Sequence, residues 1–500
     1  MVDRLLGTRV ATQLAGIDEN GMKSRQGNTQ YSSLGGMLSC GRQAEANECR
    51  NPKTIDEANV LIHRLMQSAW LVNAWAILAA FGTYFCMYMY RKPFTVAAFK
   101  QEALAPGFGG EGFGGDWDQK AVLVSAQVIG YLVSKLVGIR VVSEAGPERR
   151  AWTILMLILA ALGSLFLFAV VPSPWHVVCM FLNGLPLGIV FGLVLGSLEG
   201  RRLTEALAAG LCASFILAGG VAKTVGQQVM DTTQQRLGWN LAESERWMPF
   251  LSGLLFFLPI CFFLWMLHQI PPPTLLDQTV RSPREPMRKE DRWYIVRTYA
   301  WGIGAIAGMY FIVSILRSFR DDFAREILTG LGAKIQSSDY ASIDFWVMLV
   351  ATIANASAVL VKDNRQALRL AFATCTVGFL LILLSVLGHR FWMEISPMGL
   401  MVCIGAGLYL PYVAVHTTVF ERIIACTRDR ANVGFMMYVA DSVGYFGYAI
   451  LILSKNFFLG SIPETSFASV FLTTCLLGSI GSILFVAIAS RSFDRLEVKQ

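Results

Sequence analysis

The apolar residues of this chain fall into blocks of about 20, the length of a helix that spans the hydrocarbon layer of a bilayer. Hydrophobic residues make up 54% of the chain and charged residues only 15%. Twelve blocks lie at about residues 68–90 or beyond, 120–140, 152–171, 177–198, 206–230, 249–267, 294–317, 345–361, 370–387, 398–420, 433–454 and 467–489. The sequence therefore predicts an all-α membrane protein with twelve transmembrane helices.

A basic, proline-rich segment divides the blocks into two groups of six. Residues 270–293 contain the run PPPTLLDQTVRSPREPMRKEDR, which is typical of a linker. The linker separates an N-terminal half at 68–269 from a C-terminal half at 294–490. Residues 1–67 are polar and rich in Gly, Ser, Asn and Gln, so we expect an N-terminal tail there, with a short C-terminal tail at 491–500.

Loop charges predict the orientation. If both termini are inside, the outer loops carry about half as many lysines and arginines as the inner loops, as the positive-inside rule requires. We therefore expect an integral plasma (inner) membrane protein with both termini cytoplasmic. The net charge of +7 belongs to these loops, so we expect no nucleic acid partner.

One helix motif occurs twice, in the same register, at the first and seventh blocks. WAILAAFGTYFCMYMYR at residues 75–91 returns as WGIGAIAGMYFIVSILR at 301–317, so that Tyr84 recurs as Tyr310 and Arg91 as Arg317. An arginine inside a bilayer costs roughly 3 kcal/mol, which a protein usually tolerates for function. Alternatively, each arginine extends to the outer interface and the repeat records only a duplication.

Two repeated groups of six helices are typical of a transporter that rocks one half against the other around a central site. The arginines of the first and seventh helices should then face one another across the pseudo-twofold axis. Arg91 and Arg317 would select an anion, because the planar guanidinium fork binds phosphate or carboxylate with two hydrogen bonds. From Pro93 and Phe94 to Phe99 the chain is largely apolar, so we expect the first helix to continue past Arg91.

Three motifs resemble a known family of transporters. They are YRKPF at residues 90–94, Leu316 and Arg317 with Asp322 beyond, and YLVSKLVG at 131–138. Together with the twelve blocks, they resemble the organophosphate:phosphate antiporters of the major facilitator superfamily, whose members include glycerol-3-phosphate and hexose-phosphate transporters.

The resemblance implies roles for particular residues. In that family the arginines of the first and seventh helices bind the substrate phosphate, and a lysine after a serine in the second helix adds positive charge. The matching residues here are Arg91, Arg317 and Lys135. The chain departs from the pattern in two places. Val142 stands where the superfamily's loop between helices two and three has an aspartate, so the resemblance does not extend to the gating role of that loop. Ser214 and Phe215 stand where the glycerol-phosphate transporters have a histidine before a glycine cluster, which implies a different organic moiety and an uncharacterised branch.

Other polar residues inside the predicted spans have alternative interpretations. Lys223 adds a cation to the site or extends to the outer surface. Asp441, the only carboxylate near the middle of a predicted span, carries a proton or cation, or neutralises Lys135 or Lys223. His416 titrates near neutral pH or is simply a hydrogen-bonded helix residue.

Charged residues end the fourth and tenth spans at equivalent positions of the two halves. Glu199 with Arg201, and Glu421 with Arg422, should lie at the cytosolic face. There they form gating ion pairs between helices or are merely solvated helix ends.

Several function classes are excluded. The ten cysteines stand singly and the five histidines are scattered, so we expect no metal, no cofactor and no enzyme. No Walker loop is present, which leaves exchange against phosphate or coupling to protons as the energy source. We therefore predict a secondary active transporter of an anionic, phosphorylated small solute that works as a monomer by alternating access. The alternatives are a membrane sensor that binds such a ligand without net transport, and a carrier of a carboxylate or other solute.

Overall fold

The structure, a computed structural model, describes residues 69–99, 119–144, 147–198, 204–271, 297–359, 361, 363–391, 395–427, 433–458 and 464–494. All of them lie in one compact unit, Arg64–Gln500. The predicted N-terminal tail at 1–67, most of the predicted linker and the chain beyond residue 494 lie outside the described residues.

The N-terminal half contains six spans, the last of which is broken. Its helices are α2 (Ala69–Tyr88), α3 (Gln119–Glu144), α4 (Pro147–Val170), α5 (His176–Leu198), α6 (Thr204–Leu237), α7 (Leu241–Leu255) and α8 (Phe257–His268). The helix α7 begins with a capping box, in which the Asn240 side chain accepts a hydrogen bond from the Glu243 backbone at 2.8 Å. The sixth span therefore begins earlier than the apolar residues alone predicted.

The C-terminal half repeats this arrangement. Its helices are α11 (Ala300–Asp322), α12 (Ala324–Gly330), α13 (Ser337–Val359), α14 (Asn364–Phe391), α15 (Pro397–Ala414), the π-helical turn η2 (Val415–Val419), α16 (Phe420–Thr427), α17 (Val433–Phe458) and α18 (Glu464–Asp494). Among the described residues, 11 helical spans are long and apolar enough to cross a membrane, and α17 has a shorter apolar core at Val439–Ile452. The predicted all-α membrane fold is confirmed.

The expectation that the first helix continues past Arg91 is wrong. The helix α2 ends at Tyr88, and turns lead into a short 3₁₀ helix, η1 (Pro93–Val96). Pro93 has no backbone N–H and its ring would clash with the carbonyl of the preceding helical turn, so the helix cannot continue regularly through it. Arg91 therefore lies on a turn, although it is buried as expected.

Two helices of the second half extend beyond their predicted limits. The helix α11 continues past Arg317 to Asp322, and α13 begins at Ser337 instead of residue 345. Both extensions carry charged residues that an apolar count assigns to loops. In the structure Asp322 and Asp344 are buried, so these charges belong to the interior of the bundle.

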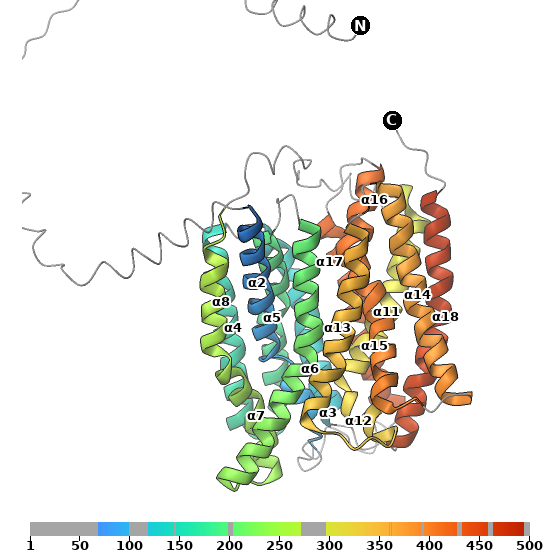
Figure 1. The fold of residues 1–500 in the computed structure, drawn as a ribbon. Coiled ribbons are helices and arrows are strands. Elements are labelled where there is room, and N and C mark those ends of the chain that lie inside the picture. The colour runs from blue at the N-terminus through green and yellow to red at the C-terminus, as the bar shows by residue number, and fades with distance from the viewer. Residues whose placement is uncertain are drawn as a thin grey trace, which may run out of the picture. The chain divides into compact units, whose positions relative to one another are not determined.

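Two helix pairs join the halves along their length. Helix α6 packs against α13, and α3 packs against α17. In Figure 1, α2 begins and α18 ends at the same end of the helical bundle. At Gly220 of α6 an added Cβ would meet the Cβ of Asp344 at 2.9 Å, so only glycine permits this close approach between the halves.

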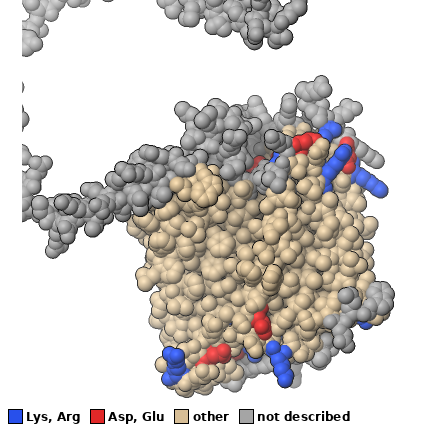
Figure 2. Space-filling view, viewed as in Figure 1, with Lys and Arg blue, Asp and Glu red and all other residues tan. Residues whose placement is uncertain are grey.

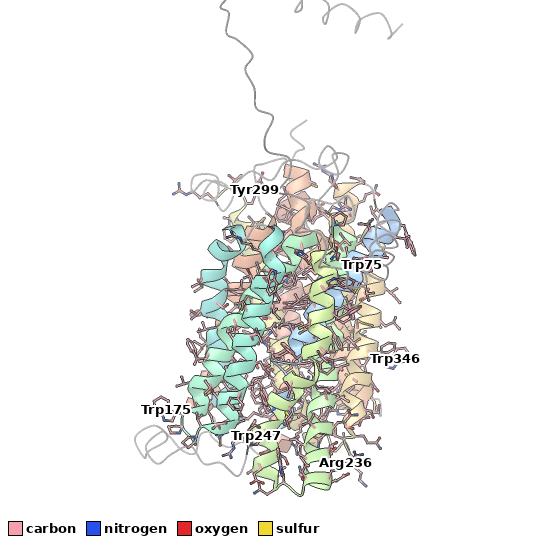
Figure 3. All side chains as sticks on the ribbon, turned by 90° about the vertical axis from the view of Figure 1, so that its left-hand side faces the viewer. Trp75, Trp175, Arg236, Trp247, Tyr299 and Trp346 are labelled. Atoms are coloured by element: carbon pink, nitrogen blue, oxygen red, sulfur yellow. The ribbon has the colours of Figure 1, made fainter. Side chains whose placement is uncertain are left out.

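The surface matches a membrane-embedded bundle. Figure 2 shows charged side chains gathered toward two ends of the bundle, with a broad uncharged belt between them. Figure 3 shows Trp175 and Trp247 toward one end, and Trp75 and Tyr299 toward the other. Tryptophan and tyrosine are enriched at the two membrane interfaces. The chain is therefore an integral membrane protein whose belt faces lipid.

Candidate functional site

The turn that carries Arg91 is fixed by two polar side chains of neighbouring helices. The Gln127 side chain donates a hydrogen bond to the Arg91 carbonyl at 3.1 Å, and Asn183 donates one to the Tyr90 carbonyl at 3.2 Å. Gln127 also donates to the Asn183 side chain at 2.8 Å. These bonds satisfy carbonyls that the end of α2 leaves without helical partners, and they hold the Arg91 side chain in place.

The guanidinium group of Arg91 contacts aromatic rings instead of carboxylates. Its carbon lies 4.1 Å from the ring centroid of Tyr131, 5.8 Å from that of Tyr445 and 5.9 Å from that of Tyr88. Within the described part of the chain, no carboxylate forms an ion pair with Arg91, and its buried Nε has no hydrogen-bond partner. Ring faces attract a cation but accept no strong hydrogen bond, so this group can still bind an anion.

Arg317 lies in a similar aromatic environment on α11. Its guanidinium carbon is 4.5 Å from the Tyr412 ring centroid, and Nη2 donates to the Ser318 hydroxyl at 3.3 Å. Nη1 lies 3.5 Å from Asp321, which also binds Arg320 at 3.2 Å. The buried Nε of Arg317 has no partner among the described residues.

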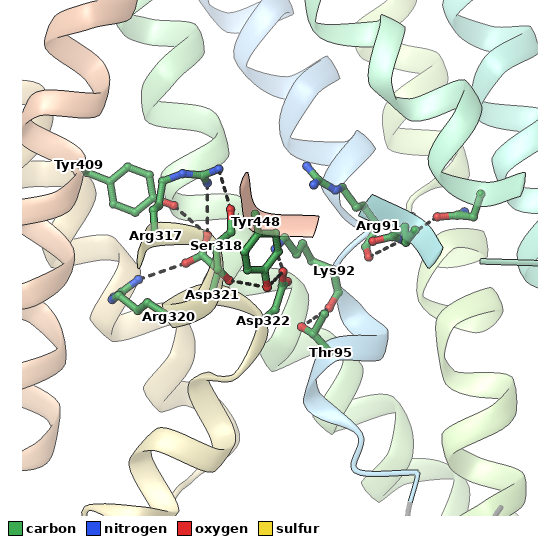
Figure 4. A network of polar contacts seen from close by, with 12 residues as sticks. Arg91, Lys92, Thr95, Arg317, Ser318, Arg320, Asp321, Asp322, Tyr409 and Tyr448 are labelled. Atoms are coloured by element: carbon green, nitrogen blue, oxygen red, sulfur yellow. Dashed lines mark hydrogen bonds and ion pairs between the residues drawn. The ribbon is translucent and has the colours of Figure 1, made fainter. Parts of the chain in front are cut away.

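The two arginines come from opposite halves and point toward one another. Figure 4 shows Arg91 and Arg317 on two sides of the same region, with Tyr448 between them. Tyr88 and Tyr445 each interact electrostatically with both guanidinium groups. The geometry brings together two buried cations with unused donors, which is an arrangement that can bind an anion.

Lys135 meets three other predicted site residues in a second cluster. Its ammonium group forms a buried ion pair with Asp441 of the other half. The Tyr310 hydroxyl donates to the same carboxylate, and His416 Nε2 lies 3.4 Å from it. Of the two lysines that could neutralise Asp441, the structure shows an ion pair with Lys135. Lys135 is therefore not free to bind an anion in this state.

Tyr84 lies beside these clusters but in a hydrophobic environment. Its ring centroid is 5.4 Å from that of Phe191, 5.5 Å from that of Tyr88 and 6.3 Å from that of Phe215. The Phe191 ring in turn lies 6.1 Å from the His416 ring. Tyr84 therefore packs among the rings behind the site and interacts with Tyr131, whereas its counterpart Tyr310 donates a hydrogen bond to Asp441.

Lys223 is buried, with only 3% of its surface exposed, so its side chain does not extend to the outer surface. It interacts electrostatically with Asp321 and Asp344 of the other half, and it forms no ion pair with a described residue. Lys223 therefore adds positive charge to the layer of charged residues next to Arg317.

That layer contains ion pairs that sequence reasoning missed. Lys92 forms a buried ion pair with Asp322, which also accepts a hydrogen bond from Tyr448 at 2.7 Å. Arg320 binds Asp344 at 3.0 Å. Figure 4 shows the contacts of Lys92 and Tyr448 with Asp322, and that of Arg320 with Asp321, beside the two arginines. Lys92 and Asp322 connect the two halves, so this network also determines how closely they approach.

Asp441 is not the only buried carboxylate of the helical spans. Asp321, Asp322 and Asp344 are also buried within helical spans. The sequence signal was present, because Arg320, Asp321 and Asp322 directly follow the second copy of the repeated motif. The apolar count placed the end of the helix before them.

The predicted gating residues are only partly described. Glu199 and Arg201 lie outside the described residues. Glu421 and Arg422 are half-buried, and Arg422 donates to the side chain of Asn364 at 2.7 Å. This bond lies within the C-terminal half. In the described ranges, no cluster of three or more His, Cys, Asp and Glu residues could hold a metal ion.

The fold is similar to that of two solved transporters. One is a bacterial homolog of the human lysosomal transporter Spinster, in an inward-facing and unoccupied conformation, with a TM-score of 0.53 and 13% identity over 85% of this chain and 99% of that one. The other is a D-xylose–proton symporter, with a TM-score of 0.56 and 13% identity over 84% of this chain and 96% of that one. These similarities show the twelve-helix major facilitator fold.

The sequence comparisons identify a family but no characterised relative. No curated protein sequence matches the chain. Residues 93–495, most of both halves, match the family of unknown function DUF5690, and the chain belongs to that family.

Proposed function

We propose that this protein is a secondary transporter that carries an anionic, phosphorylated small solute by alternating access. One observation carries the proposal: Arg91 and Arg317 are buried at equivalent positions of the two halves, and the Nε of each lacks a partner among the described residues. A buried donor without a partner costs about 1–3 kcal/mol. An anion between the arginines would satisfy both donors.

The chemistry of the site supports a phosphate group in particular. Each planar guanidinium group can donate two parallel hydrogen bonds to the oxygens of one phosphate. Arg91 has no carboxylate partner among the described residues, and Arg317 has only the long contact with Asp321. The motif resemblance to organophosphate:phosphate antiporters adds support for a phosphorylated solute, and the similarity to two solved transporters supports transport.

Contacts between the halves support alternating access. On the side of the bundle where α2 ends, Lys92 pairs with Asp322, Lys120 pairs with Glu326 at 2.6 Å, and Arg325 donates to the Val96 carbonyl at 2.9 Å. Because these bonds join the halves beyond the arginines, they close that side. To open that side, these bonds must break as the two halves rotate relative to one another.

Binding and flux measurements test the proposal. The purified protein is heated with inorganic phosphate, glycerol 3-phosphate, glucose 6-phosphate or succinate, and uptake of any stabilising compound into proteoliposomes is measured. We expect a phosphorylated compound to raise the unfolding temperature and to be transported, because a ligand of the folded state stabilises it. Stabilisation by none of these anions would overturn the proposal. Binding without flux would identify a sensor, and stabilisation by succinate alone a carboxylate carrier.

We further propose that the protein works as a monomer in the plasma membrane with both termini in the cytosol. The basic inner loops support this orientation. Reporter domains fused after residue 500 that are active only on one side of the membrane would test it. If only the reporter that works outside the cell were active, the orientation would be opposite to the one proposed.

A further inference from the structure

His416 has a fixed hydrogen position because of its backbone contact. Its Nδ1 lies 2.9 Å from the carbonyl oxygen of Tyr412, which can only accept, so Nδ1 carries the hydrogen. In the neutral ring the lone pair is then on Nε2. That nitrogen lies 3.4 Å from Oδ1 of Asp441. Two acceptors therefore face one another in a buried site.

No described neighbour supplies the missing hydrogen. The Tyr310 hydroxyl lies 3.4 Å from Nε2, but it donates its single hydrogen to Asp441. The titratable groups that contact or act on this cluster are Lys135 of α3, Cys212 of α6, Tyr310 of α11, Tyr412 of α15, and Asp441 and Tyr445 of α17. Helix α5 presents the apolar ring of Phe191, and α16 carries Glu421 and Arg422 in its first turn. The guanidinium carbon of Arg317 lies 4.5 Å from the centroid of the Tyr412 ring, against which the His416 ring stacks.

Lys135 connects this cluster to the anion site. Its ammonium nitrogen lies 5.4 Å from the Tyr131 ring centroid and 5.3 Å from that of Tyr445. Arg91 contacts the same two rings, at 4.1 and 5.8 Å. An anion beside Arg91 is therefore close to Lys135, whose charge Asp441 compensates in this state.

We propose that His416 Nε2 binds a proton that travels with the anion, and that this proton releases Lys135 from Asp441 so that Lys135 joins Arg91 and Arg317. The inference rests on the proposed function and adds its co-transported ion. A proton from water adds to the Nε2 lone pair, an N–H bond forms, and no bond of the protein breaks. The imidazolium then donates to Asp441, and the charge of that carboxylate is compensated within its own half.

The coupling follows from charge compensation. Once His416 is protonated, Asp441 is shared between two cations, so an anion that binds beside Lys135 becomes more favourable. Anion binding should therefore raise the proton affinity of His416, and protonation should raise the affinity for the anion by the same factor. The π-helical turn η2 that carries His416 fits this role, because such turns often occur at functional sites.

Proton uptake on binding tests the inference. Calorimetric titration of the purified full-length protein with glycerol 3-phosphate, in buffers of different ionisation enthalpy, counts the protons taken up. We expect wild type to take up about one proton more per bound anion than His416→Gln. Protons that the anion itself takes up or releases on binding are common to both proteins and cancel in this comparison. The control His389→Gln, in α14 beside a separate cavity, should behave as wild type. Equal proton uptake in wild type and His416→Gln, with anion binding retained, would overturn the inference and leave the proposed function intact.

A second measurement needs no anion. In protein labelled with ¹⁵N-histidine, the His416 resonance is identified by its loss in His416→Gln and titrated by NMR. We expect Lys135→Met to move the titration midpoint to higher pH, because a nearby cation is removed, and Asp441→Asn to move it to lower pH. A midpoint that Lys135→Met leaves unchanged would overturn the inference, even if no tested anion binds. Lys135→Met is suited to this test because Asp441 keeps its contacts with Tyr310 and His416.

Discussion

Arg317 lies 3.5 Å from Asp321, four residues further along α11, and this contact leaves most of the arginine available. Arg320 binds the other oxygen of the same carboxylate, Oδ1, at 3.2 Å. The Tyr409 hydroxyl donates a hydrogen bond at 3.0 Å to Oδ2, the oxygen that Arg317 faces. Asp321 is therefore largely compensated without Arg317. The neighbouring carboxylate fixes the position of Arg317 but does not neutralise it.

The first prediction concerns both arginines. Changing Arg91 or Arg317 to lysine keeps the charge but removes the planar fork, so anion binding should weaken by about 1.5–3 kcal/mol. Thermal-shift titration and proteoliposome uptake measure the effect. The control Arg236→Lys, exposed in the last turn of α6, should change neither. Unchanged uptake in both site variants would show that the arginines serve only packing.

The second prediction concerns the ion pair of Lys135 with Asp441. Asp441→Asn removes the charged partner with which the buried ammonium group of Lys135 forms its ion pair, and it should destabilise the protein by about 3–5 kcal/mol. Lys135→Met should be milder, because the Tyr310 hydroxyl still donates a hydrogen bond to the carboxylate. The double variant should recover much of the stability, measured as thermal unfolding in detergent. A fully stable Asp441→Asn variant would contradict a structural role for this pair.

The third prediction concerns the ion pair of Lys92 with Asp322, which joins the halves. Lys92→Met should favour opening of that side, because the closed state loses the attraction between the halves. Spin labels at Arg236 and Lys334, exposed on opposite halves, should show a larger separation. The control Arg369→Met breaks an exposed pair at 2.9 Å within one half and should leave the distance unchanged. An unchanged distance in Lys92→Met would show that other contacts determine closure.

The fourth prediction concerns two glycines in different surroundings. Gly220→Ala places a Cβ 2.9 Å from the Cβ of Asp344, so the halves must separate slightly, at a cost of about 1–3 kcal/mol in stability. Gly163→Ala meets nothing within 4 Å and should stabilise α4 by about 0.5–1 kcal/mol. Thermal unfolding of the two variants measures both effects. The same sign for both would mean that contact with α13 does not constrain Gly220.

The fold could be predicted because a bilayer requires long apolar helices, and their length and composition are visible in the sequence. Helix ends were harder to predict. Pro93 gave a local signal for the end of α2, but the apolar residues around it suggested a continued helix. Asp322 and Asp344 were placed outside their helices because buried ion pairs allow charged residues inside the bundle, and a hydropathy count cannot detect such pairs.

The candidate site could be predicted only in part. The internal repeat identified Arg91 and Arg317, since equivalent helices of two repeats meet at the pseudo-twofold axis. The sequence also offered Lys135 and Lys223 as partners for Asp441, but only the packing of α3 against α17 selects Lys135. The contact of His416 with that carboxylate depends on a π-helical turn, for which the sequence carried no signal.

Gly220 lies near the middle of α6, which runs from Thr204 to Leu237. At about 1.5 Å per residue, each arm of this helix measures roughly 25 Å from the glycine to its tip. A rotation of about 10° around the contact would move both tips by roughly 4 Å in opposite directions. In the alternating access that we propose, a rotation centred on the glycine contact would close one end of the protein and open the other by a similar amount, because the two arms are nearly equal.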